Sequence, residues 1–297
     1  MNEPDLLACV EETRSSIFQG DMDEAILLHY DLVMESYRRK PLFYKKLLKY
    51  DRFIVTLSLL SFMFADDRVP LSRVKAFCQA RGYMSRNSLD TYFSFLLSAG
   101  YMQVRLHDED ERQRVFKLTD RAVCEVRQMI DSYVLPSQIV APYERGLVGA
   151  GIPEDVVPSY FHGIARVLYA NGTLDQRLPE ARWMINRDGG HLPMLALYSD
   201  SLRNGPLKVG YKAATYVELS ARLGVSKTHI IRMVKEGELR GYFKCRKHQV
   251  ELLPAFIDLV RKIMAIYFSV ARVSMELGME YGSKRNRLCA AGSLSGE

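Results

Sequence analysis

Apolar residues recur at helical spacing along most of the chain. Residues 5–17 and 21–37 both show this period, with Gln19-Gly20 between them. A longer apolar run then extends from Pro41 to about Ala65. Its most apolar part, 53–65, is too short to span a bilayer and has charges on both sides, so the pattern predicts a buried core helix.

A more specific order of elements follows. We expect helices at 71–80 and 86–98, the second ended by Gly100, and then strand-like runs at 101–106 and 114–118. A further helix, capped at Thr119-Asp120, is expected to run to about residue 133. Three helices, a β-hairpin and a helix are the layout of a winged helix-turn-helix.

The same order recurs after a stretch broken by prolines, in which 158–170, 179–185 and 191–202 have helical patterns. We expect a helix at 215–223, a turn at Gly224-Val225, a helix at 226–236 ended by Gly237, and a hairpin within 238–252. A long amphipathic helix then runs from Pro254 to about residue 277, and the tail from Gly282 is expected to fray. Internal duplication is the favoured interpretation, and two unrelated helical hairpins are the alternative.

The predicted fold is mainly α with small β-hairpin wings (α+β): two winged helix-turn-helix modules joined by a helical connector. The predicted divisions are N-terminal helices (1–47), a first module (48–134), a connector (135–205), a second module with a long C-terminal helix (206–281) and a flexible tail (282–297).

Charge is distributed unevenly along this plan. The whole chain has a formal net charge of +6, yet residues 208–297 hold 16 Lys and Arg against 8 Asp and Glu. The basic excess of the chain therefore lies in its last third, which favours a polyanionic partner there. A solvated basic surface is the simpler explanation.

The segment "LGVSKTHIIRMVKEGELRGYFKCRKHQ" gives this charge a possible use. Gly224 suits a tight helix-helix turn, and an apolar face is supplied by Leu219, Leu223, Val225, Ile230 and Met233. This pattern, over about 20 residues, resembles the bacterial helix-turn-helix family. The opposite face and the hairpin are rich in cations and hydrogen-bonding groups, so we predict that they contact double-stranded DNA. The predicted contacts are Lys227, Thr228, His229, Arg232, Arg240, Lys244, Arg246 and Lys247.

The first module carries a different surface. Its leading helix, "SRNSLDTYFSFLLSAGYMQV" and "FKLTDRA" resemble the MarR-like winged helix over residues 48–133, which implies a DNA-binding third helix and wing. The wing tip departs from that family because 108–111 are four consecutive acids, so a protein-binding role is an alternative. The residues predicted to contact DNA here are Arg86, Asn87, Ser88, Thr91, Arg112 and Arg114.

Other chemistry finds little support. The histidines form no HExxH pair, and the sequence contains no P-loop, GxGxxG or GxSxG. "NRDGGH" at 186–191 is better explained as a turn. Five scattered cysteines match no zinc spacing and are expected to be reduced, although cations around Cys245 could favour its thiolate. We therefore expect that the protein is not an enzyme and uses no cofactor or metal. The chain opens with "MNEPDLLACVEE", which is acidic and unlike a signal peptide, so we expect a cytoplasmic protein.

These observations favour a sequence-specific transcription regulator. A plasmid- or phage-type replication initiator also fits tandem winged helices, and a tandem winged-helix protein-interaction adaptor is the third possibility. The apolar surface of 255–277 predicts a homodimer contact, with core burial as the alternative, and 5–37 should pack on the first module or on a second chain. No membrane partner is expected, and any small-molecule effector is unknown.

Overall fold

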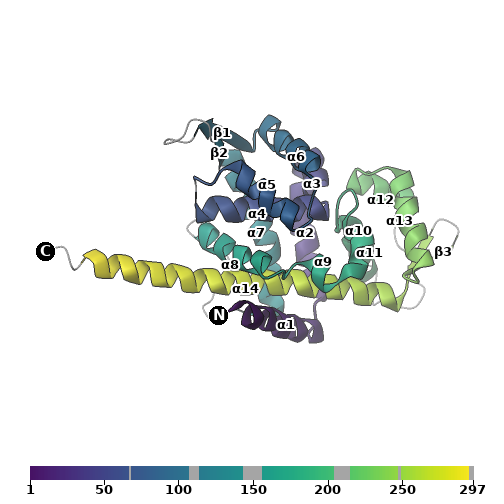
Figure 1. Ribbon diagram of the computed structural model, residues 1–297. Helices are drawn as coiled ribbons and strands as arrows, with labels where there is room; N and C mark the ends of the chain where they lie inside the picture. The colour runs from purple at the N-terminus through teal and green to yellow at the C-terminus, as the bar shows by residue number, and fades with distance from the viewer. Residues whose placement is uncertain (67, 107–113, 143–155, 204–214, 247–248, 294–297) are drawn as a thin grey trace.

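The computed structural model describes residues 1–66, 68–106, 114–142, 156–203, 215–246 and 249–293. Within these residues the chain is mainly helical, with two small antiparallel sheets of two strands each (Figure 1). This confirms the predicted α+β class. In the same residues, no helix combines the length and the apolar composition that crossing a membrane requires.

The first half of the chain begins with three helices: α1 (Glu3–Gln19), α2 (Asp23–Arg39) and α3 (Pro41–Leu47). The first unit follows and consists of α4 (Tyr50–Ala65), α5 (Leu71–Ala80), α6 (Arg86–Ser98), β1 (Met102–Leu106), β2 (Arg114–Leu118) and α7 (Asp120–Val140). The predicted bounds of α5 and α6 are confirmed. The single apolar run predicted from Pro41 is two helices, α3 and α4.

The connecting segment contains α8 (Val157–Tyr169), α9 (Leu174–Arg177), the 3-10 turn η2 (Pro179–Ala181) and α10 (Arg182–Ile185). The second unit consists of α11 (Leu192–Arg203), α12 (Tyr216–Leu223), α13 (Lys227–Leu239), β3 (Phe243–Arg246), β4 (Gln249–Leu252) and α14 (Pro254–Ser293). The order helix, helix, helix, hairpin, helix thus occurs twice.

The two units match closely at their third helices. Ser85 and Ser226 both cap the helix, each accepting a hydrogen bond from the backbone N–H three residues on, at 3.4 and 3.1 Å. Both helices are 13 residues long. Each is followed by a glycine with positive φ, Gly100 at 72° and Gly241 at 77°. The predicted difference in helix length is therefore wrong.

The error came from Gly237, which was expected to end α13 but lies inside it. Gly237 is buried, and a Cβ there would lie 2.3 Å from ring atoms of Phe243 and 3.2 Å from Trp183. The glycine is needed for packing, because the Phe243 ring occupies the space of a side chain. The first unit has Leu96 at the equivalent position, and Leu96 is buried.

The hairpins pair with short, regular registers. In the first, Met102 lies opposite Leu118, and in the second, Phe243 lies opposite Leu252. An isolated bridge between Pro70 and Val115 also ties the segment before α5 to β2. The first hairpin is therefore paired with the segment that leads into α5 of the same unit.

A core shared by both units dominates the interior. Buried residues of one continuous cluster come from α2, α4 and α7 as well as from α11, α13 and α14. The α2 helix packs on α7 of the first unit and on α11, which confirms the predicted packing for α2, whereas α1 packs on α14 instead. The connecting segment is part of this core, since α8 packs against both α4 and α14.

Helix α14 runs along the length of the molecule, across the lower part of Figure 1 with α1 beneath it. It continues to Ser293 and so includes residues predicted to fray, because 282–293 contain no proline and several good helix formers. At its crossing with α8, a Cβ on Gly163 would lie 2.0 Å from the Ser274 carbonyl oxygen. A Cβ on Gly278 would lie 2.2 Å from that of Ser159. The two backbones approach closely because both contacts are glycines.

The apolar face of α14 is covered within the chain. Most of the apolar residues predicted to form a homodimer contact are instead buried in the shared core. These include Val260, Ile263, Met264, Phe268, Ala271 and Met275. Helices α8, α1 and α7 supply the cover. The surface assigned to a dimer is therefore core, as the alternative interpretation held, and a homodimer stays a prediction without that support.

Two buried histidines lie where α2 meets both units. Pro136 sits inside α7, which runs past the predicted end near 133, and proline cannot donate to the carbonyl of Ser132 four residues earlier. His29 Nδ1 donates to that carbonyl instead, and its Nε2 accepts from Nε2 of His191 at 3.0 Å. Burial lowers the pKa of His29 to about 4 and also lowers the pKa of His191. The pair is neutral and fully packed.

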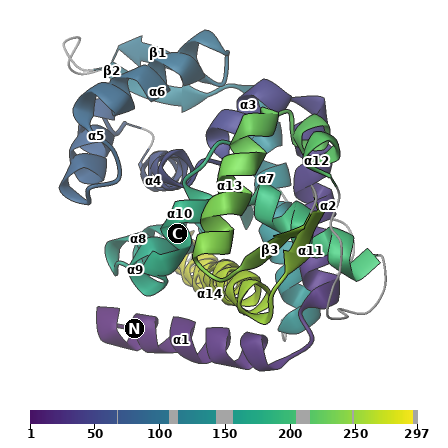
Figure 2. The ribbon, with the colours of Figure 1, turned by 90° about the vertical axis from the view of Figure 1, so that its right-hand side faces the viewer.

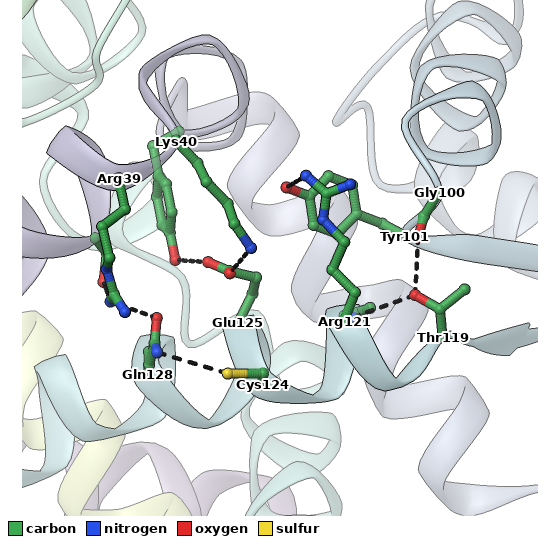
Figure 3. A network of polar contacts seen from close by, with 12 residues as sticks. Arg39, Lys40, Gly100, Tyr101, Thr119, Arg121, Cys124, Glu125 and Gln128 are labelled. Atoms are coloured by element: carbon green, nitrogen blue, oxygen red, sulfur yellow. Dashed lines mark hydrogen bonds and ion pairs between the residues drawn. The ribbon is translucent and has the colours of Figure 1, made fainter.

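A polar network fastens α2 and α3 to α7 (Figure 3). The buried carboxylate of Glu125 accepts from Lys40 Nζ and from the Tyr44 hydroxyl, while Arg39 donates to Gln128 at 2.7 Å. Burial, followed by the neighbouring Glu125, raises the pKa of Tyr44. The first unit is thereby held by the same helices that contact the second.

Candidate nucleic-acid interface

The α12–α13 pair is a tightly capped helix-turn-helix. Thr215 and Glu218 form a reciprocal capping box at the start of α12, with the Thr215 N–H donating to Glu218 Oε2 at 2.7 Å. Gly224 ends α12 in the left-handed conformation at φ 57°. The Tyr37 hydroxyl donates to the Leu223 carbonyl at 2.5 Å. The turn is therefore fixed by α2 as well as by its own residues.

The predicted inward face of this pair is confirmed. The side chains at Leu219, Leu223, Val225, Ile230 and Met233 are all buried. They join the shared core, so α13 has a single free side. Residues at the other helical positions are turned away from that core.

The outward side of α13 carries hydrogen-bonding groups and cations. Lys227, Thr228 and Arg232 are exposed, as is Lys235, which the sequence interpretation missed although it lies one turn after Arg232. Within the described part of the chain, no ion pair or hydrogen bond engages the side chains of these four residues. These groups are free to meet an external anion.

His229 departs from this arrangement. It is half-buried, and its Nε2 is enclosed without a hydrogen-bond partner among the described residues. Burial, followed by Arg187, lowers the pKa of His229. The reason is positional, because His229 lies one turn before the buried Met233 and so shares its side of the helix. His229 does not belong to the exposed surface.

The second hairpin offers fewer free cations than predicted. Arg240 pairs with Glu236 at 3.0 Å, and its guanidinium lies 5.1 Å from the centroid of the Trp183 ring, so its charge is already engaged within the chain. Lys244 is exposed, opposite Glu251 in the strand register. For Arg246 only the backbone is described, and Lys247 lies outside the described residues.

Cys245, between those cations, is not activated. Burial is the largest cause that raises its pKa, so the protonated thiol is favoured. Its backbone N–H donates to Glu238 Oε1 at 2.8 Å. Cys245 is part of the hairpin structure.

The start of α6 presents a polar surface of weaker charge. Arg86, Asn87, Ser88 and Thr91 are all exposed, as predicted. The Thr91 hydroxyl donates to the Asn87 carbonyl at 2.8 Å, which leaves its oxygen as an acceptor. Arg112 lies outside the described residues, and the structure describes only the backbone of Arg114.

A cleft opens beside this end of α6. It encloses about 540 Å³ between the α5–α6 turn and α6 on one side and the α3–α4 junction and α10 on the other. Its charged lining residues are Lys46, Lys49, Asp51, Arg52 and Arg182. This cleft was not predicted, although the run "KKLLKYDR" at 45–52 already places most of its cations together in the sequence.

Helix α3 lies between the two helix-turn-helix pairs. Lys45 Nζ donates to the Gly224 carbonyl at 3.3 Å, and Lys46 Nζ lies 4.1 Å from the centroid of the Phe95 ring on α6. Successive lysines thus contact the second and the first unit. Figure 2 shows α3 between α6 and α13 in the same view.

The described residues contain no cluster of His, Cys, Asp and Glu that could hold a metal ion. The predicted turn at 186–191 is confirmed, and it packs so tightly that a Cβ on Gly190 would lie 1.7 Å from the Leu48 carbonyl oxygen. No family model, curated protein or solved structure matches the chain.

Proposed function

We propose that this protein binds double-stranded DNA and acts as a sequence-specific transcription regulator, with two winged helix-turn-helix units in one chain. The observation that carries the proposal is the outward side of α13, where Lys227, Arg232 and Lys235 are exposed and unpaired within the described residues. A surface that is merely solvated usually mixes acids with bases, and the sequence from Ser226 to Val234 contains no acid.

The geometry of α13 supports major-groove contact. Its buried side fixes the helix to the core, and Ser226 caps an N-terminus that attracts phosphate. Thr228 and Arg232, one turn apart, have the chemistry to contact a phosphate or thymine methyl and a guanine edge, respectively. The exposed Lys244 on the adjoining hairpin would contact the DNA backbone.

The test begins with selection of bound fragments from a random DNA library, followed by binding isotherms on the enriched and a scrambled duplex. We expect Arg232→Ala to weaken the specific site by about 1–3 kcal/mol and to relax sequence preference. Lys262→Ala is the matched control, because Lys262 lies on α14 beside Asp258, at 2.7 Å. Unmoved isotherms for Arg232→Ala on both duplexes would exclude α13 as a DNA reader.

A further inference from the structure

We call the cleft beside α6 the basic cleft and define it by Lys46, Lys49, Arg52 and Arg182. These four cations lie close together without forming an ion pair with any residue that the structure describes. Among the described residues, no carboxylate lies within ion-pair distance of any of the four. The one acid in the lining, Asp51, accepts a hydrogen bond from Asn186 Nδ2 at 2.8 Å. Four cations around one acid repel each other unless an anion enters.

Two of these cations are held in place by aromatic rings. Lys46 Nζ lies 4.1 Å from the centroid of Phe95, and the Arg52 guanidinium lies 5.8 Å from that of Tyr92. Tyr92 is itself fixed by a hydrogen bond between its hydroxyl and Thr56, at 2.7 Å. Such stacking orients the charges while leaving their N–H groups available to a ligand.

The opposite wall supplies hydrogen-bonding groups from α6. Asn87, Ser88 and Thr91 line the cleft, next to the helix N-terminus capped by Ser85. A helix N-terminus with cations on the facing wall favours an anion with several oxygens. Phosphate fits this chemistry.

The character of the lining argues for a nucleic-acid backbone. Sites for small organic ligands are mostly apolar with a few polar groups, whereas most side chains in this cleft are charged or polar. The cleft also lies close to both helices, because Lys46 of the cleft contacts Phe95 of α6, and its neighbour Lys45 on α3 donates to the Gly224 carbonyl in the turn before α13.

We propose that the basic cleft binds phosphates of the same DNA duplex that α13 contacts, so that both units engage one duplex. This inference rests on the proposed function and extends it to a second contact surface. The cleft supplies backbone contacts, which add affinity and salt dependence, whereas α13 supplies sequence preference.

The experiment uses the full chain with the two exposed cleft cations neutralised, Lys46→Gln with Arg182→Gln. Losing two phosphate contacts should reduce the slope of log K against log salt by about 2, and affinity at 0.1 M salt by about tenfold to a hundredfold. The loss should be equal on specific and scrambled duplexes. Lys262→Gln serves as the control for charge alone, and Lys46→Arg with Arg182→Lys should restore binding.

A thermal-unfolding arm with AMP and inorganic phosphate tests the other source of phosphate. If the DNA slope is unchanged while AMP stabilises the original chain but not the double variant, the cleft is a site for a free phosphorylated ligand and our inference is wrong. If neither readout changes, the cleft binds no phosphate and the inference is equally wrong.

The outcomes also separate this inference from the proposed function. An effect of Arg232→Ala without an effect of the double variant would overturn the cleft alone. The reverse result would leave the cleft as the DNA contact and remove α13 as the reader. No duplex binding by the original chain would overturn both the proposed function and the cleft as a DNA contact.

Discussion

Helices α6 and α13 have the same length, the same serine cap and the same glycine after their ends, yet their surroundings differ. The exposed side of α13 carries free cations at Lys227, Arg232 and Lys235, whereas the exposed positions of α6 include one arginine, Arg86, among mostly uncharged polar residues. The cations near α6 instead lie across the cleft from it, on other elements. The same scaffold thus places positive charge either on the helix or opposite it.

The interiors of the two helices differ as much as their surfaces. Leu96 in α6 fills a core made by the first unit itself. Its counterpart, Gly237, admits Phe243 and lies near Trp183 of α10. At this position the second unit packs against Trp183 of the connecting segment, whereas the first unit fills the same position with its own Leu96.

The largest expected effects are losses of stability on substitution of Leu96 and Gly237. Leu96→Ala removes a buried side chain and should lower the free energy of unfolding by about 2–5 kcal/mol. Gly237→Ala should also destabilise, by about 1–3 kcal/mol through overpacking against Phe243, although alanine favours helix more than glycine. Urea unfolding monitored by circular dichroism measures both.

Gly241→Ala is the control that tests backbone strain without packing. Nothing lies within 4 Å of the Cβ position of Gly241, so only its positive φ should make an alanine there destabilising. A stabilised Gly237→Ala variant would show that Phe243 does not need the space, and would remove the packing contrast between α6 and α13.

The next largest expected effect is the pH dependence of stability that arises from His29, which is buried between the two units. Burial lowers the pKa of His29 to about 4, so protonation is resisted in the folded chain and permitted in the unfolded one, whose pKa is about 6.5. Stability is therefore fully present above pH 6.5 and falls as the pH drops from about 6.5 to about 4. The loss from His29 should be on the order of 3 kcal/mol. Unfolding in urea at a series of pH values measures it.

His162→Gln is the comparison for this pH series, because His162 on α8 is only half-buried, with its ring stacked on Tyr281, whereas His29 is fully buried. It should retain most of the pH dependence, whereas His191→Leu should alter it. A flat profile from pH 6.5 to 4 in the original chain would mean that the folded chain does not resist protonation of His29, and the prediction would be wrong.

The smallest effect is expected at Arg86. It is exposed at the first turn of α6, where a phosphate contact would contribute affinity without sequence preference. Arg86→Ala should weaken specific and scrambled duplexes alike, by about 1 kcal/mol or less. Binding isotherms beside those of Arg232→Ala decide the matter, and a loss confined to the specific duplex would make α6 a second reader of bases.

Local signals predicted most of the helices and both hairpins. Serine and threonine caps, glycine turns and helical periodicity act within a few residues, and they placed α5 and α6 at their observed bounds. Gly237 misled the prediction because its role depends on Phe243 and Trp183, which periodicity cannot place against it. Pro136 misled it similarly, since His29, far away in sequence, satisfies the carbonyl that proline leaves free.

The candidate surface was predicted in part. Exposure of Lys227, Thr228 and Arg232 follows from their spacing relative to the buried stripe. The role of Arg240 could not be predicted, because it depends on where Trp183 lies. The cleft is assembled from α3, α4, α6 and α10, so only the tertiary fold brings its cations together.

The packing of α14 has a consequence for how the chain is made. This helix covers α1 and α8, and it crosses α8 backbone to backbone at Gly163 and Gly278. While a ribosome is still translating 254–293, the surfaces of α1 and α8 that α14 covers lack that cover, although α8 can already pack on α4. The nascent chain therefore completes its core late in synthesis, and a product that stops before α14 exposes surface prone to aggregation.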